Sequence, residues 1–145
     1  MSGLILVDSN VILYTLDQRE TAKRRRCEAW LKAAITNSLI TISPQVCTEV
    51  RNAGVRKLNL PSDEMRTVVR NLLPFCRAPL GQNEVSRALT LETRFQLHWL
   101  DALLLASAIG AGCTHFLTED APSAPVIEGV AIIDPFVAPP GDVLG

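Results

Sequence analysis

The sequence predicts an α/β fold in which a central parallel β-sheet is flanked by helices. Three observations support this prediction. Short apolar segments, typical of buried strands, occur at residues 4–7, 39–42, 114–118 and 130–133. Longer segments with helical spacing lie between them, and strands that alternate with helices indicate a parallel sheet. The 145 residues contain no internal repeat and no linker, which indicates a single domain.

The first apolar run, Leu4 to Val7, is bounded by Gly3 and by polar residues. A run so short and so apolar fits a strand that is buried on both faces. Asp8 follows it directly, and ligands of open α/β sheets bind at the carboxyl ends of the strands. Asp8 is therefore either the N-cap of a helix beginning at Ser9 or part of a functional site.

Two helices are expected next, over residues 9–16 and 19–37. The second contains four consecutive basic residues, Lys23 to Arg26. Four adjacent residues cover all sides of a helix, so the run is either a solvated surface or a region that attracts phosphate groups.

A strand at 39–42 precedes a helix that we expect to run from Pro44 to Ala53. Ser43 is its expected N-cap and Gly54 a possible C-cap. Glu49 lies within the apolar face of this helix, where an unpaired carboxylate is costly. Its partner would be a metal ion or, in a buried salt bridge, Arg51 or Arg56.

The chain then continues with helices expected at 61–73 and 83–96, separated by an extended segment at 75–80. The segment 99–109 is the most apolar helix and is expected to be buried centrally. Its single charge is Asp101, either a capping acid or a site residue. His98, beside Trp99, is expected to be packed or at the surface.

The strand at 114–118 is followed by Glu119 and Asp120, which repeats the arrangement at Asp8. A loop is expected at 121–125 and a last strand at 130–133. The domain is therefore expected to span residues 1–137. The Pro- and Gly-rich tail, 138–145, is expected to be loose.

Composition narrows the function classes. No apolar run approaches the ~20 residues of a membrane span, and no basic n-region precedes the first apolar segment, so a cytoplasmic protein is expected. The four cysteines are widely spaced and are expected to be buried free thiols rather than zinc ligands. All 14 lysines and arginines lie at or before Arg94, whereas the rest of the chain carries only acidic charges, so the basic part could bind a polyanion.

Four acids have positions that suggest a site: Asp8, Glu49, Asp101 and Asp120. Asp8 and Asp120 follow strands whose carboxyl ends share one edge of the sheet. Carboxylates that are forced together need a counter-ion, and Mg²⁺ or Mn²⁺ prefers oxygen ligands. Such ions promote phosphodiester hydrolysis by activating water and neutralising negative charge.

Five segments in order resemble the sequence blocks of the PIN domain family, and in particular its single-domain VapC toxins. Ser9 replaces the usual Thr of the first block, and Asp134 replaces the usual Asn of the closing block. The five segments are Leu6–Leu13, Ser43–Val50, Trp99–Ala108, Phe116–Asp120 and Ile132–Phe136.

The resemblance implies a three-layer PIN-like fold and a Mg²⁺-dependent endoribonuclease, the toxin of a type II toxin–antitoxin pair. Mn²⁺ would substitute for Mg²⁺, the chain would form a homodimer, and an antitoxin would hold it inactive. Catalytic and metal-binding roles would fall to Asp8, Glu49, Asp101 and Asp120, while Asn10 and Thr118 would orient the ligands. The expected RNA-binding residues are Arg19, Lys23, Arg24 and Arg51.

Two alternatives remain open at this point. A phospho-receiver domain has a similar topology, but it should have adjacent acids after the first strand and a lysine after the last one, and no lysine follows Lys57. A PIN-like domain that only binds RNA or protein, without a toxin role, is the second alternative. The four acids favour an enzyme over either.

Overall fold

The computed structural model describes residues 3–37, 39–120 and 125–144. Its centre is a five-stranded sheet of order β2-β1-β3-β5-β4, in which β2, β1, β3 and β5 are parallel. The strands are β1 (Ile5–Val7), β2 (Ile40–Thr41), β3 (His115–Leu117), β4 (Val126–Ile127) and β5 (Val130–Ile133).

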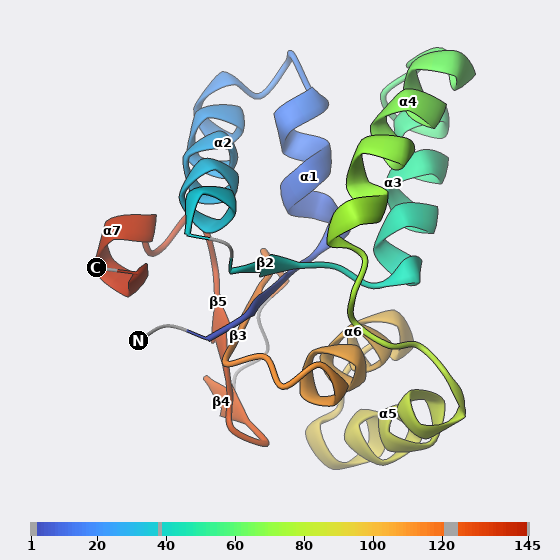
Figure 1. The fold of residues 1–145 in the computed structure, drawn as a ribbon, viewed down its shortest axis with the longest axis vertical. Helices are drawn as coiled ribbons and strands as arrows, with labels where there is room; N and C mark the ends of the chain where they lie inside the picture. The colour runs from blue at the N-terminus through green and yellow to red at the C-terminus, as the bar shows by residue number, and fades with distance from the viewer. Residues whose placement is uncertain (1–2, 38, 121–124, 145) are drawn as a thin grey trace.

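Helices cover both faces of this sheet (Figure 1). Helices α1 and α2 lie on one side and α5 and α6 on the other, while α3 packs against both α1 and α4. The helices are α1 (Ser9–Leu16), α2 (Thr21–Thr36), α3 (Pro44–Arg56), α4 (Ser62–Leu72), α5 (Gln82–Phe95), α6 (Trp99–Gly110) and α7 (Pro140–Leu144), with a short 3₁₀ helix, η1 (Leu73–Phe75). The predicted three-layer α/β architecture is confirmed.

The core lies on both faces of the central strands. Leu6 and Val7 of β1 and Leu117 of β3 have no exposed surface, and Phe116 is 2% exposed. This two-sided burial explains the uninterrupted apolar runs, because a strand covered by helices on both faces has no polar face. The site at the ends of these strands is thus held by the most buried part of the fold.

One edge of the sheet differs from the prediction of an entirely parallel sheet. Strand β4 pairs with β5 in antiparallel orientation through a two-residue turn. Both turn residues, Glu128 and Gly129, have positive φ (51° and 80°), as the tight turns of β-hairpins require. The sequence lacks the usual Asn-Gly signal there, and the segment was therefore not expected to be a strand.

Helix α3 extends further than the sequence indicated. We expected it to end at Ala53 with Gly54 as C-cap, but it continues through Gly54 to Arg56. Gly54 is buried, and a Cβ at this position would clash with Cε of Met65 in α4. This glycine therefore allows α3 and α4 to approach each other. Ser43 occupies the N-cap position as predicted, but its hydroxyl makes no capping hydrogen bond.

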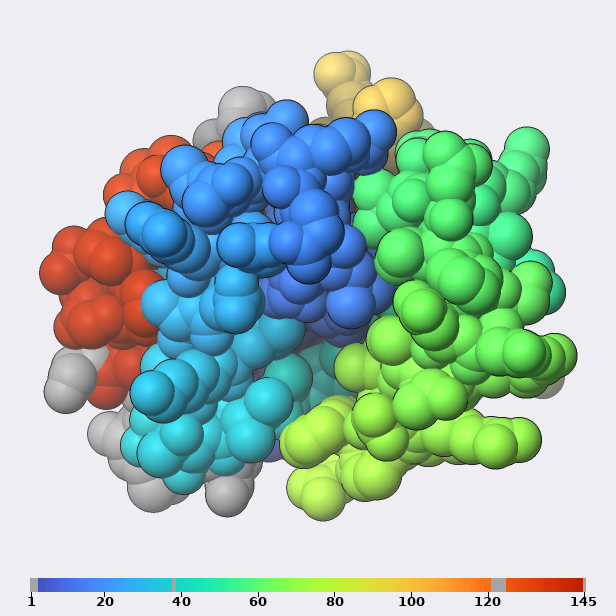
Figure 2. All heavy atoms as spheres, turned by 90° about the horizontal axis from the view of Figure 1, so that it is seen from above, coloured from blue at the N-terminus to red at the C-terminus, as the bar shows by residue number. Residues whose placement is uncertain are grey.

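Two further segments differ from the expectations. Leu73–Phe75 forms η1, where part of the segment was expected to be extended. The tail after Ala138, which we expected to be loose, contains α7, and the indole Nε1 of Trp30 donates to the carbonyl oxygen of Ala138 at 2.9 Å. Figure 2 shows this C-terminal segment against α2. Most of the loop expected at 121–125 lies outside the described residues.

Two negative findings apply to the described part of the chain. None of its helices is both long and apolar enough to cross a membrane. Its four cysteines are all free thiols, and Cys27, Cys47 and Cys113 are buried, whereas Cys76 is partly exposed.

Candidate metal centre

Asp8 lies at the end of β1 and at the start of α1. It is only 4% exposed, and it serves as N-cap of α1, with Oδ1 accepting a hydrogen bond from the backbone N of Ser9 at 2.6 Å. Its second oxygen, Oδ2, accepts from the hydroxyl of Thr118 at 2.7 Å. Asp8 therefore caps a helix and lies in the acidic cluster described next, so its two predicted roles are compatible.

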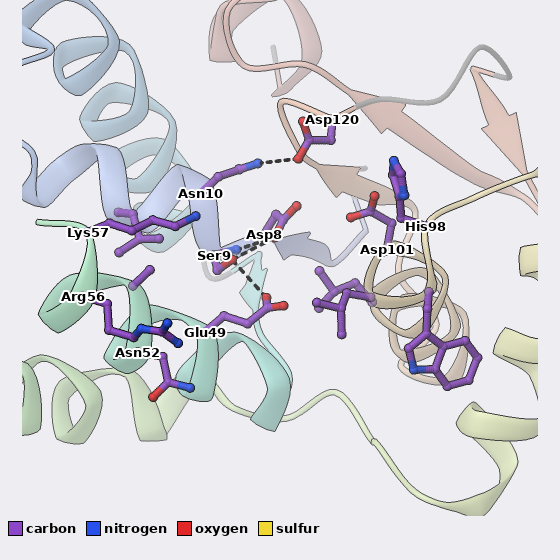
Figure 3. A pocket seen from close by; sticks show the side chains of 15 residues that line it. Asp8, Ser9, Asn10, Glu49, Asn52, Arg56, Lys57, His98, Asp101 and Asp120 are labelled. Carbon is purple, nitrogen blue, oxygen red and sulfur yellow. Dashed lines mark hydrogen bonds between the residues drawn. The ribbon is translucent and has the colours of Figure 1, made fainter.

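Asp101 and Asp120 meet Asp8 at the carboxyl edge of the sheet. Asp101 is in the first turn of α6, and Asp120 follows β3. One carboxylate oxygen from each of the three residues lies within 4.8 Å of the other two. Residues separated by up to 112 positions in the sequence therefore form one cluster, as Figure 3 shows.

Glu49 is linked to this cluster through a hydroxyl group. The Ser9 Oγ atom lies 3.2 Å from Oδ1 of Asp8 and 3.0 Å from Oε1 of Glu49. Because a hydroxyl has one proton, it can donate to only one of these carboxylates at a time. Oε2 of Glu49 accepts from Nε2 of Gln45 at 3.2 Å. The salt bridge to Arg51 or Arg56 that we considered is not formed.

Two polar side chains hold the loop after β3 in place. The Thr118 hydroxyl donates to Asp8 and also accepts a hydrogen bond from the backbone N of Asp120 at 3.1 Å. Nδ2 of Asn10 donates to Oδ2 of Asp120 at 3.5 Å. Thr118 and Asn10 therefore lie where residues that orient the acids should lie.

Burial and nearby charges raise the pKa values of two of the acids, Asp8 and Asp101. The pKa of Asp8 is raised to about 6, mainly because burial removes water from the charged form, and the charges of Glu49 and Asp101 raise it further. The pKa of Asp101 is also raised, by burial and then by Asp120. The hydrogen bonds from Thr118 and Ser9 oppose the rise at Asp8.

The donor set fits a hard divalent cation. Three carboxylates point toward one space, and within the described residues no lysine or arginine forms an ion pair with any of them. Mg²⁺ and Mn²⁺ favour such all-oxygen sites. A cation held there would stabilise the ionised carboxylates and offset the raised pKa values.

The acids form part of the lining of an open cavity of about 860 Å³. Asp8 lies near its centre, Asp120 lies above it in the view of Figure 3, and His98 lies beside Asp101 on the α6 side. The opposite wall, from α3, presents Asn52, Arg56 and Lys57. We had not expected Asn52 or Lys57 to contribute, and we had considered Arg56 only as a salt-bridge partner of Glu49.

The four basic residues expected to bind RNA do not line the cavity that contains Asp8, Asp101 and Asp120. Arg19 pairs with Asp17 at 2.9 Å, Lys23 with Glu119 at 3.1 Å and Arg24 with Glu28 at 3.4 Å. Arg51 is exposed on α3 and does not line the cavity. RNA contact by these four residues stays a prediction.

Comparison with known proteins identifies a family whose model matches most of the chain. The model of the PIN domain family matches residues 5–122. No curated protein matches the sequence.

Solved structures of low sequence identity share the fold. A toxin–antitoxin complex from Klebsiella pneumoniae aligns with a TM-score of 0.65 and 22% identity, over 90% of this chain and 97% of that one. FitAcB from Neisseria gonorrhoeae aligns with a TM-score of 0.67 and 19% identity, over 92% and 99%. VapBC2 from Rickettsia felis, solved bound to a DNA fragment from its promoter, aligns with a TM-score of 0.65 and 13% identity, over 90% of this chain and 97% of that one.

Proposed function

Because the chain belongs to the PIN domain family, we propose that it is a metal-dependent endoribonuclease and the toxin of a type II toxin–antitoxin system. The observation that carries this proposal is the cluster of Asp8, Asp101 and Asp120, whose carboxylate oxygens lie within 4.8 Å of one another in an open cavity. Because the match is to the PIN domain family, the phospho-receiver alternative no longer applies.

In this proposal Asp8, Asp101 and Asp120 hold Mg²⁺, or Mn²⁺ in its place, and Glu49 completes the site. Glu49 is placed to act directly or through water, since Ser9 already connects it to Asp8. When bound, such an ion activates water for attack on the phosphodiester and neutralises the charge that develops on the phosphate.

The remaining residues of the site position these acids. Thr118 holds Asp8 and the backbone of Asp120 together, and Asn10 restrains the Asp120 side chain. Ionised carboxylates spaced in this way repel one another, so the ligands need hydrogen bonds that keep them together before the cation binds.

The proposed partners are RNA, an antitoxin protein and a second copy of the chain. One of the three solved structures named above is a toxin–antitoxin complex, and the fold of all three extends over at least 90% of this chain. This supports an antitoxin partner. An open acidic cavity is also a surface that a protein could cover to block the site.

The test of the proposal is RNA cleavage by the purified protein. We expect cleavage with Mg²⁺ or Mn²⁺, its loss with a chelator, and its loss in Asp8→Asn and Asp101→Asn with the fold retained. Growth arrest on expression, relieved by a protein encoded beside it, would identify a toxin. A wild-type protein that binds RNA but does not cleave it would support the binding-domain alternative instead.

A further inference from the structure

We propose that Arg56 and Lys57, on the α3 wall of the acidic cavity, form a phosphate-binding subsite that holds the RNA backbone beside the metal centre. This inference rests on the proposed function, and it assigns a role to residues outside the acidic cluster. Three observations support it: the position of the two cations, the absence of partners for them, and the shape of the groove that they line.

The first observation is position. Arg56 is the last residue of α3 and Lys57 follows it as C-cap, and both line the cavity that contains Asp8, Asp101 and Asp120. In Figure 3 they lie on the wall opposite Asp101 and His98, with Asp8 between the two walls. A strand whose reacting phosphate lies over the acids would place a neighbouring phosphate near this wall.

The second observation is that these cations have no partner. Arg56 and Lys57 are exposed, and neither forms an ion pair or a side-chain hydrogen bond with the rest of the described chain. Arg19, Lys23 and Arg24 are, by contrast, all paired with acids. Arginine and lysine side chains whose donors are free are suited to phosphate oxygens.

The third observation is that the groove continues past Lys57. A second hollow, between α1 and α3, shares Asn10, Leu13, Ala53 and Lys57 with the first and extends to Tyr14 and Arg19. Lys57 therefore lies where the two hollows join. Two adjoining hollows suit an extended, single-stranded polyanion better than a small ligand.

A simpler explanation is that these charges stabilise the helix. Positive side chains at the carboxyl end of a helix interact favourably with its dipole. That role affects the melting temperature and does not involve RNA. The two explanations therefore make different predictions, which one set of variants can separate.

The experiment compares variants that lose one positive charge each. Arg56→Ala and Lys57→Ala remove the proposed subsite, whereas Arg70→Ala in the last turn of α4 and Lys32→Ala on α2 remove exposed charges outside the cavity. Arg56→Lys keeps the charge. The kcat and KM for cleavage of a single-stranded RNA are measured for each, together with the melting temperature.

We expect Arg56→Ala and Lys57→Ala to raise KM several-fold, with a smaller change in kcat, while Arg70→Ala and Lys32→Ala stay close to wild type. Binding of the same RNA to the Asp8→Asn protein should weaken when the two alanines are added. The slope of log affinity against log salt should fall by about 0.7 for each lost phosphate contact. Arg56→Lys should retain most of the affinity.

Several results would overturn the subsite. An equal rise in KM in all four single alanine variants would indicate general attraction of RNA to the positive surface of the protein. A lower melting temperature with unchanged KM would indicate that the two charges only stabilise the helix. If polyglutamate binding, but not RNA binding, depended on the pair, the groove would accept an acidic protein segment instead. A wild-type protein that neither binds nor cleaves RNA would refute the proposed function itself, whereas normal cleavage by the Arg56→Ala, Lys57→Ala double variant would refute only the subsite.

Discussion

The hydroxyl of Thr118 donates a hydrogen bond to Oδ2 of Asp8 at 2.7 Å, and this bond ties the end of β3 to the end of β1. The hydroxyl oxygen of Thr118 also accepts a hydrogen bond from the backbone N of Asp120 at 3.1 Å. One buried side chain therefore connects the carboxylate of Asp8 to the backbone of Asp120, and the carboxylates of these two residues would otherwise repel each other. The proposed metal centre depends on such restraints, and the predictions below begin with this one.

Replacing Thr118 with Val should reduce RNA cleavage by about 10- to 100-fold, the usual effect of losing a residue that orients metal ligands. Val has nearly the same shape but cannot donate to Asp8 or accept from Asp120. Thr118→Ser keeps the hydroxyl and should retain most of the activity. Cleavage rates measured across a range of Mn²⁺ concentrations would check this, and equal activity of the Val and Ser variants would contradict it.

Asp8→Asn should make the metal-free protein more stable near neutral pH, although it removes activity. The raised pKa of Asp8, about 6 against an ordinary 3.8, means that its charged form destabilises the folded state. The free energy of unfolding should fall as pH rises from about 4 to 6, and above 6 the loss should be roughly 3 kcal/mol.

Thermal denaturation at about pH 4 and about pH 7.5 tests this sign, because the burial penalty applies only when the carboxyl is ionised. We expect the melting temperature of Asp8→Asn to exceed that of wild type at the higher pH and to match it more closely at the lower one. A variant that is less stable than wild type at about pH 7.5 would contradict the direction of the pKa shift.

Stabilisation by Mn²⁺ should increase with pH between about 5 and 7, because the cation binds the ionised carboxylates. The pKa values of both Asp8 and Asp101 are raised, so protons compete with the cation in this range. The measurement is the Mn²⁺-induced change in melting temperature at each pH. Asp101→Asn is the control and should show little change, and a pH-independent effect in wild type would argue for binding elsewhere.

Much of the fold could be predicted from the sequence because its signals are local. The apolar run after Gly3 and the helix from Ser9 to Leu16 appear in the structure almost as predicted. The hairpin at Glu128 and Gly129 was missed because its positive φ angles occur without the Asn-Gly pair that marks such turns.

The α3 wall of the cavity was not predicted from the sequence for a different reason. Gly54 has the local signature of a helix end, but its use here is to allow close approach of Met65, which is a contact between helices. That misreading ended the helix before Arg56 and left the α3 wall of the cavity incomplete. The pairing of Lys23 with Glu119, 96 residues apart, was equally invisible in the sequence.

This pairing leads to a prediction for Lys23. Its Nζ donates to Glu119 at 3.1 Å and to the hydroxyl of Tyr14 at 3.2 Å, and it lies over the rings of Tyr14 and Phe136. Glu119 precedes Asp120, so Lys23→Met should loosen this segment and raise the Mn²⁺ concentration needed for half-maximal activity. Lys32→Met, on the same helix, is the control.

The alternative role of Lys23, direct RNA binding, would give the opposite pattern. Its loss would then raise KM for RNA and leave the Mn²⁺ requirement unchanged. Steady-state kinetics with both RNA and Mn²⁺ varied would distinguish the two roles.

Gly54→Ala should lower the free energy of unfolding by about 1–3 kcal/mol, the usual cost of overpacking a core. Alanine is otherwise the better helix former, so the loss would come from its contact with Met65, which is fully buried. Combining the change with Met65→Val should restore part of the stability. Urea denaturation measures both, and a stabilised single variant would show that α3 and α4 separate easily.

The most direct test of the metal centre is anomalous diffraction from a crystal of the protein grown with Mn²⁺. We predict an anomalous peak bounded by the carboxylates of Asp8, Asp101 and Asp120, present at the Mn²⁺ concentration that supports RNA cleavage. A protein that cleaves RNA under those conditions with no peak at this position, or with its peak at other residues, would contradict the assignment.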